Sequence, residues 1–249
     1  MVEFLKRDNA PDLAYVSLES TDKGENLPTL MFLGGFRSDM EGTKALFLEE
    51  KCRARGQAFI RFDYRGHGVS EGKFEEACIS DWTQDAKDIL EHCTKGPVML
   101  VGSSMGGWIS LLLALQRPDR IHSFIGLAAA PDFTKIMEAM MSDEQKNALE
   151  NKGYFDLPND YDTPYIITKK LIEDGRQNCL LDKNLKINIP IRLIQGMKDT
   201  DVEWQTAHRI KNSILNDDAE VILLENADHR LSTPEDLEIL DKTVQSLLT

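Results

Sequence analysis

The chain of 249 residues has the length of one large domain, and 41% hydrophobic and 29% charged residues are typical of a globular protein. Acidic residues outnumber basic ones by 42 to 29, and the formal net charge of −13 argues against nucleic acid or an anionic lipid surface as a partner. The most apolar run, Ile109 to Leu115, is far shorter than the roughly 18 to 20 residues of a membrane-spanning helix.

The N-terminal segment, from Met1 to Pro11, carries several charges and lacks the apolar core of a secretory signal. We therefore expect a soluble protein that stays in the compartment where it is made. The four cysteines form no CxxC pair and have no histidine at metal-ligand spacing. We expect reduced, mostly buried thiols rather than a disulfide or zinc framework.

Short β-rich runs recur along the chain, and helical patterns separate most of them. The middle runs are almost wholly apolar, as is typical of strands buried on both faces of a parallel sheet. The predicted strands span residues 14–19, 29–33, 58–62, 98–101, 123–127, 189–195 and 220–224. This alternation predicts an α/β fold with a mostly parallel sheet and helices on both faces.

The predicted helices have recognisable start and stop signals. Gly56 ends one helix, Ser80 and Asp81 cap another, and Thr233 with Pro234 begins the last. These helices span residues 43–55, 80–94, 104–116, 203–215 and 234–248.

The segment from Pro131 to about Lys186 interrupts the alternation of strands and helices. No β-run is recognisable in it, and residues 136–149 and 163–174 are predicted to be helical. We interpret it as a small helical cap, inserted at about 131–186 into a single domain that spans residues 1–249. Its apolar side chains form either an acyl-chain pocket or the cap's own core, and periodicity does not distinguish the two; they are Ile136, Met137, Met140, Met141 and Phe155.

The strongest chemical signal is the GxSxG pattern from Gly102 to Gly106, with Ser104 at its centre. It directly follows a predicted buried strand and directly precedes a predicted helix, which is the context of a nucleophile elbow. Such a turn needs small residues on either side, and it aims the N–H of the next residue at a developing oxyanion. Ser103 is the competing serine, but its position favours a supporting role in the turn.

A nucleophilic serine needs a histidine base and an acid, which this kind of fold places later in the chain. His229 follows the strand at 220–224 and is the predicted base, whereas His208 lies within a predicted helix and is expected to face solvent. Asp199 follows the strand at 189–195 and is the preferred acid, with its neighbour Asp201 left open.

A second oxyanion donor is expected from the glycine pair after the strand at 29–33. The predicted donors are the backbone N–H groups of Phe36 and Met105. Asp63 and His67 lie in another glycine-punctuated loop, but both precede the nucleophile. We therefore interpret them as braces for the surrounding loops rather than as a second catalytic pair.

Together these residues resemble the α/β-hydrolase family, over nearly the whole chain from about Phe4 to Leu248. Within that family the chain is similar to the group of α/β-hydrolase domain-containing protein 10, whose members are palmitoyl-protein thioesterases and acyl-glucuronide esterases. The matching stretches are residues 42–46, 60–64, 100–108, 190–193, 196–199 and 228–230. The resemblance implies that Ser104, Asp199 and His229 take the nucleophile, acid and base positions.

The chain departs from the family pattern at two positions near the site. Leu33 precedes the oxyanion-loop glycine where the family often has histidine or proline, and Gln195 replaces a frequent histidine before the acid loop. Neither change removes a catalytic group. The animal members of the group are mitochondrial, but the chain lacks an arginine-rich transit segment. We therefore expect a bacterial relative in the cytoplasm.

These observations predict a serine hydrolase that cleaves carboxylic esters or acyl thioesters through an acyl-enzyme on Ser104. It needs no metal and no organic cofactor, and its substrate is a small molecule or an acylated protein. A lactonase, peptidase or C–C hydrolase on the same fold remains an alternative, as does a non-enzymatic binding module. The acyl group, the leaving group and the oligomeric state remain open.

Overall fold

A computed structural model describes residues 1–157 and 164–248 of the chain. An eight-stranded sheet runs through it in the order β1-β2-β4-β3-β5-β6-β9-β10. β1 pairs with β2 and β2 with β4 in antiparallel fashion, and every later pair is parallel. The strands are β1 (Glu3–Leu5), β2 (Leu13–Leu18), β3 (Thr29–Leu33), β4 (Phe59–Phe62), β5 (Val98–Ser103), β6 (Ile121–Leu127), β9 (Ile191–Gly196) and β10 (Ala219–Leu224). The predicted α/β fold is confirmed, whereas the short edge strand β1 was not expected.

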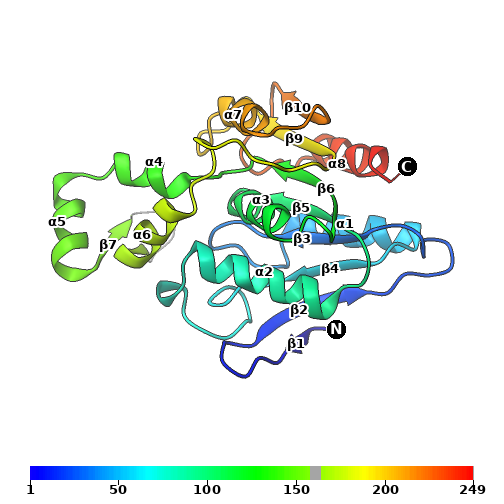
Figure 1. Ribbon diagram of the computed structural model, residues 1–249, viewed down its shortest axis with the longest axis horizontal. Helices are drawn as coiled ribbons and strands as arrows, with labels where there is room; N and C mark the ends of the chain where they lie inside the picture. The colour runs from blue at the N-terminus through cyan, green and yellow to red at the C-terminus, as the bar shows by residue number, and fades with distance from the viewer. Residues whose placement is uncertain (158–163, 249) are drawn as a thin grey trace.

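Helices cover both faces of this sheet (Figure 1). Successive strand residues point to opposite faces, so β5 sends Val98 and Leu100 into one core and Met99 and Val101 into the other. The first core also contains side chains of α2 (Ile79–Cys93), α3 (Met105–Gln116) and α7 (Gln205–Ser213). The second contains side chains of α1 (Thr43–Arg55) and α8 (Pro234–Ser246). Burial on both faces explains why the central strands are continuous apolar runs.

The helix signals in the sequence are confirmed at α1 and α8 but not at α2. Gly56 ends α1 in the left-handed conformation at φ +71°, and Thr233 caps α8. α2 begins earlier than predicted, with Cys78 at its N-cap position, so the predicted cap at Ser80 is wrong. The Ser80 hydroxyl instead donates to Asp174 Oδ1 at 2.6 Å, which is a contact that no local pattern reveals.

The connecting segment (residues 128–190) joins β6 to β9 and projects beyond one end of the sheet (Figure 1). It contains α4 (Phe133–Ala139), α5 (Asp143–Lys152), β7 (Tyr154–Leu157), β8 (Tyr165–Thr168) and α6 (Lys169–Gln177). The prediction of no strand here is wrong, because β7 and β8 pair as an antiparallel ribbon. The predicted helix at 163–174 begins outside the described residues, and its part at 165–168 is β8.

Two predicted features of this segment change in the folded chain. The predicted helix at 136–149 is divided into α4 and α5, because Ser142 starts a new helix with a capping box. Met141 and Phe155 are buried in the first core, whereas Ile136 and Met140 are 48% and 80% exposed. Part of the apolar set therefore stabilises the segment, and part of it faces solvent.

Among residues 1–157 and 164–248, no helix combines the length and the apolar character needed to cross a bilayer. All four cysteine thiols are free; Cys52 and Cys78 are buried, and Cys93 and Cys179 are partly exposed.

Candidate active site

Ser104 occupies a strained turn between β5 and α3. Its backbone has φ +53° and ψ −116°, a conformation that costs free energy in any residue other than glycine. The turn is held because the Ser104 N–H donates to the carbonyl of Leu127 at 2.9 Å. A side chain at Gly102 would clash with the carbonyl of Gly106, and one at Gly106 would clash with that of Leu33. The crowded backbone thus explains the glycines of the motif and exposes the serine at the carboxyl end of the sheet.

His229 lies in the loop between β10 and α8, and its ring faces Ser104. The distance from His229 Nε2 to Ser104 Oγ is 3.2 Å, and that from His229 Nδ1 to Asp199 Oδ2 is 2.8 Å. The carboxylate accepts a hydrogen bond from Nδ1–H, so the proton of the neutral ring is on Nδ1, and Nε2 is an acceptor for the serine hydroxyl. The structure therefore brings together three residues that are up to 125 positions apart in the sequence.

Asp199 has a fully buried carboxylate whose two oxygens are both hydrogen-bonded. Oδ1 accepts the backbone N–H groups of Asp201 and Val202 at 2.9 and 2.8 Å. Burial raises the pKa of Asp199, but the hydrogen bonds from His229 and Val202 outweigh this effect, and the pKa is lowered overall. Asp201, the alternative acid, is exposed and supplies only its N–H to this carboxylate.

Gln195 is a further member of the site that sequence reasoning did not assign. It is buried on β9, and its side-chain Nε2 donates to Asp199 Oδ2 at 2.9 Å and to the carbonyl of Val202 at 3.2 Å. The signal was present in the sequence, because Gln195 replaces the histidine that the family frequently has there. An amide N–H can supply the same donor as an imidazole N–H.

The loop after β3 passes directly beside the serine. A methyl group added to Gly35 would lie 3.4 Å from Ser104 Cβ. Neither Phe36 nor Met105 donates its backbone N–H to another residue of the described chain. The Phe36 ring packs edge-on against Phe74, at a centroid distance of 4.9 Å, and against Phe133 at 5.4 Å. These two N–H groups are therefore the candidate donors of an oxyanion hole.

Lys44 of α1 supports the loop between β10 and α8, which carries His229, from outside the site. Its ammonium group donates to the carbonyl of Arg230, the residue after His229. Burial lowers the pKa of Lys44 to about 8, although the carboxylates of Asp228 and Asp236 act against this shift.

Asp199, Asp201 and His229 hold potential metal-ligand atoms within 4.8 Å of one another. The oxygens of Asp199 and Nδ1 of His229 are already engaged in the hydrogen bonds described above, so this cluster has an explanation that requires no ion.

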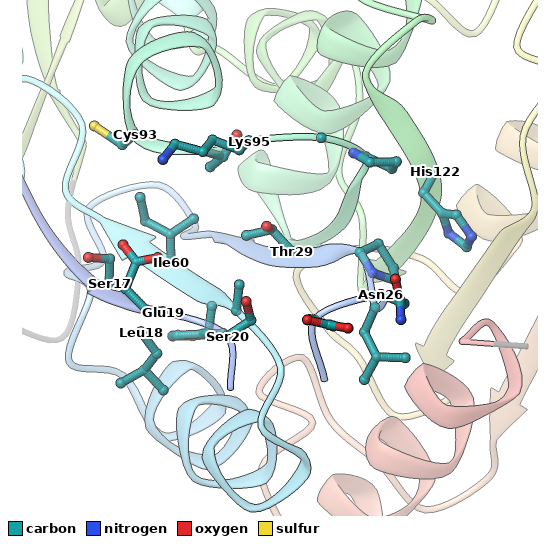
Figure 2. A pocket seen from close by; sticks show the side chains of 18 of the residues that line it. Ser17, Leu18, Glu19, Ser20, Asn26, Thr29, Ile60, Cys93, Lys95 and His122 are labelled. Atoms are coloured by element: carbon teal, nitrogen blue, oxygen red, sulfur yellow. The ribbon is translucent and has the colours of Figure 1, made fainter. Parts of the chain in front are cut away.

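A large hollow lies elsewhere, at the opposite end of the sheet. Its volume is about 880 Å³, and it is lined by residues at the start of β3 and β6, including Thr29 and His122 (Figure 2). Ser104, Asp199 and His229 are not among its lining residues. The geometry of the hydrogen-bonded side chains, rather than cavity size, therefore identifies the candidate active site.

The fold and the serine elbow define the class of protein. Residues 28–161 match the family model described as alpha/beta hydrolase fold, and the chain belongs to the α/β-hydrolase family. The chain is also 38% identical over 249 residues to palmitoyl-protein thioesterase ABHD10, mitochondrial, of Homo sapiens. This match covers 99% of the chain and 80% of the human protein. The predicted class of activity, a serine hydrolase acting on esters or thioesters, is confirmed by relatives of this kind.

Solved structures show the same likeness over the whole fold. The α/β-hydrolase domain-containing protein 10 from mouse superimposes with a TM-score of 0.90 at 35% identity, covering 99% of this chain and 98% of the mouse chain. The crystal structure of a protein from Agrobacterium vitis S4 superimposes with a TM-score of 0.94 at 33% identity, covering 100% and 99%. The relatives come from animals and from a bacterium, and a cytoplasmic bacterial location stays a prediction.

Proposed function

We propose that the chain hydrolyses acyl esters or thioesters with Ser104 as nucleophile, His229 as general base and Asp199 as the acid that orients the histidine. The observation that carries this proposal is the line of hydrogen bonds from Asp199 through His229 to Ser104. The serine at the end of these hydrogen bonds has a strained backbone, and strain of this kind is typical of functional sites.

The chemistry follows from the protonation states in this line. Ser104 Oγ attacks the carbonyl carbon while its proton moves to His229 Nε2, and Asp199 stabilises the imidazolium that forms. The oxyanion accepts hydrogen bonds from the N–H groups of Phe36 and Met105. The tetrahedral intermediate collapses, and His229 gives its proton to the departing alcohol or thiol. Water then attacks the acyl-enzyme, with His229 again as base.

The connecting segment is proposed to be a cap that covers the acyl group, with the whole chain forming one domain. The ring centroids of Phe133 in α4 and Trp108 in α3 are 5.5 Å apart, and those of Tyr165 in β8 and Phe36 are 6.2 Å apart. Side chains of the segment thus meet the oxyanion loop and the helix behind the serine. An aromatic boundary of this kind suits an acyl chain better than a charged substrate.

The relatives named above support a long-chain acyl thioester on a protein as the substrate class, since one of them is called a palmitoyl-protein thioesterase. The test compares palmitoyl and acetyl substrates, each as an oxygen ester and as a thioester. A preference for the palmitoyl thioester supports depalmitoylation. A preference for short oxygen esters contradicts it and points to a small-molecule esterase.

Ser104→Ala is the control that tests the catalytic assignment itself. This variant should lose turnover by about 10⁴-fold or more, because removal of a nucleophile leaves only binding and the oxyanion donors. Its thermal midpoint should stay within a few degrees of that of the original chain. A folded variant that retains the original rate contradicts the proposed function.

A further inference from the structure

The loop of residues 63–70, after β4, lies against the oxyanion loop of residues 34–40. Two side chains of the first loop accept backbone N–H groups of the oxyanion loop, one at its middle and one at its end. His67 reaches the N–H of Arg37, and Asp63 reaches the N–H of Met40. Sequence analysis interpreted both residues as braces, and the structure shows what they contact.

His67 is 3% exposed and has a defined tautomer. Its Nε2 accepts the backbone N–H of Arg37 at 3.2 Å, and its Nδ1 lies 3.3 Å from the carbonyl of Arg65. A carbonyl only accepts and a backbone N–H only donates, so the proton must be on Nδ1 and absent from Nε2. The ring bridges the two loops only while it is neutral.

The residue that His67 holds has an unusual backbone. Arg37 has φ +60°, which is rare for a residue with a side chain and costs free energy unless its surroundings maintain it. Arg37 directly follows Phe36, whose N–H is the proposed oxyanion donor. A hydrogen bond to the Arg37 N–H fixes the peptide unit after Phe36, and thereby limits rotation of the peptide unit before it.

Asp63 supports the same loop at its end, three residues after Arg37. Its Oδ1 accepts the N–H of Met40 at 2.7 Å, and its Oδ2 accepts the N–H of Val69 at 2.9 Å. A Cβ at Gly68 would clash with this carboxylate, so glycine is required there. The loop of residues 63–70 and the oxyanion loop are therefore joined by hydrogen bonds at two points.

We propose that His67 is a positioning residue of the oxyanion hole: its neutral imidazole holds the Arg37 amide and so sets the direction of the Phe36 N–H. This inference rests on the proposed function, because it takes Phe36 as an oxyanion donor. His67 does not touch the reacting atoms and acts only through the loop.

The surroundings of His67 suit this role. Burial lowers the pKa of the imidazole to about 4, and the charge of Arg37 acts in the same direction, so the ring is neutral at neutral pH. Aromatic rings hold it edge-on at centroid distances of 5.1 Å from Phe74, 5.3 Å from Trp82 and 5.5 Å from Tyr64. The ring is therefore packed in place before substrate binds.

The test compares His67→Phe, which keeps a flat ring but has no acceptor, with His67→Gln, whose amide oxygen can accept near the position of Nε2. His67→Phe should lower kcat by about 10- to 100-fold with KM within about threefold, since an oxyanion donor acts mainly on the transition state. His67→Gln should retain kcat within about fivefold. The matched control is His122→Phe on β6, whose ring is hydrogen-bonded to the Ser123 hydroxyl at 3.1 Å and lines the hollow at the opposite end of the sheet; it should keep the original kcat.

A folded His67→Phe variant with unchanged kcat overturns the inference. A rise in KM alone also overturns it, as does an equal loss of kcat in His67→Phe and His67→Gln. Should His67→Phe fail to fold, ¹⁵N NMR of the original protein decides: the His67 ring must show a protonated Nδ1 and an unprotonated Nε2 at pH 7. The opposite tautomer overturns the inference. Retained activity in Ser104→Ala sinks the proposed function, whereas an inactive Ser104→Ala beside an unaffected His67→Phe sinks only this inference.

Discussion

At the scale of single residues, the environments of the two carboxylates favour Asp199 over its neighbour Asp201 as the proposed acid. The carboxylate of Asp199 accepts four hydrogen bonds, and the carboxylate of Asp201 is exposed. A buried carboxylate needs such partners to stay ionised, and an ionised carboxylate is what holds the histidine tautomer. Gln195 supplies the one partner that comes from a side chain other than His229.

Removal of the Gln195 amide should therefore weaken the site without removing any group that touches substrate. Gln195→Leu is expected to lower kcat by about 10- to 100-fold, because a hydrogen bond to a charged group is worth about 1.5–3 kcal/mol. Gln195→His restores an N–H donor and should stay within about threefold of the original kcat. Steady-state kinetics on one ester at pH 7 measures both. Equal rates for the leucine variant and the original chain would disprove this role.

The buried His67 also makes stability depend on pH. Its pKa is lowered from 6.5 to about 4, so between these values the unfolded chain binds a proton that the folded chain does not. The free energy of unfolding is therefore unaffected by this residue above pH 6.5 and falls as pH drops towards 4, by up to about 3 kcal/mol. His67→Gln should reduce the loss of stability between pH 7 and pH 4.5 in urea unfolding. An identical loss in the variant contradicts the assignment.

At the scale of elements, the start of α8 connects the histidine loop to the helix layer. Thr233 Oγ1 accepts the N–H of Asp236 at 3.2 Å, and Asp236 Oδ2 accepts the N–H of Thr233 at 3.1 Å. This reciprocal pair satisfies two N–H groups that a helix start would otherwise leave open. His229 lies only four residues before Thr233, so the capping box also anchors the end of its loop.

The capping box can be tested by stability alone. Thr233→Ala is expected to lower the free energy of unfolding by about 1 kcal/mol, since the cap hydroxyl is lost. Thr233→Ser keeps a hydroxyl at the same position and should remain within about 0.5 kcal/mol of the original chain. Urea unfolding followed by circular dichroism gives both values. A serine variant as unstable as the alanine variant would show that the methyl group, rather than the cap, matters.

At the scale of the whole molecule, α6 joins the connecting segment to the sheet domain by polar contacts as well as by the burial of Leu171 and Ile172 in the first core. Asp174 accepts the N–H of Ser80 at 2.9 Å, and Lys170 pairs with Asp81 at 2.7 Å. The indole N–H of Trp108 donates to the carbonyl of Asn178 at 3.1 Å. Such contacts fix the direction of α6 against α2 and α3, whereas α4 and α5 extend away from the sheet (Figure 1).

Loss of the Asp174 carboxylate should therefore loosen α6 without unfolding the sheet. In Asp174→Ala, amide hydrogen exchange should be faster within residues 169–177 and unchanged within β5 and β6. Glu173→Ala is the matched control. Glu173 is exposed, and its ion pair with Lys169 is long, at 3.9 Å, so its loss should have little effect. Exchange measured by mass spectrometry compares the three proteins. Uniformly faster exchange across the sheet would mean that Asp174 supports global stability instead.

The sequence by itself determined the central strands, the helices α1, α3 and α8, and the nucleophile elbow. These features depend on signals within a few residues of one another: apolar runs, the stop at Gly56, the cap at Thr233, and glycines around Ser104. It also predicted His229, since loops at the carboxyl ends of parallel strands must meet at one edge of the sheet.

Only the tertiary structure decided the β7–β8 ribbon, the start of α2, the hydrogen bond between Asp199 and His229, and the contact of His67 with Arg37. The ribbon was missed because each strand has only four residues and is stabilised by its partner. The other three depend on hydrogen bonds between residues that are 30 or 94 positions apart. A local pattern carries no record of such partners, because the free energy of a hydrogen bond depends on where folding brings its two atoms.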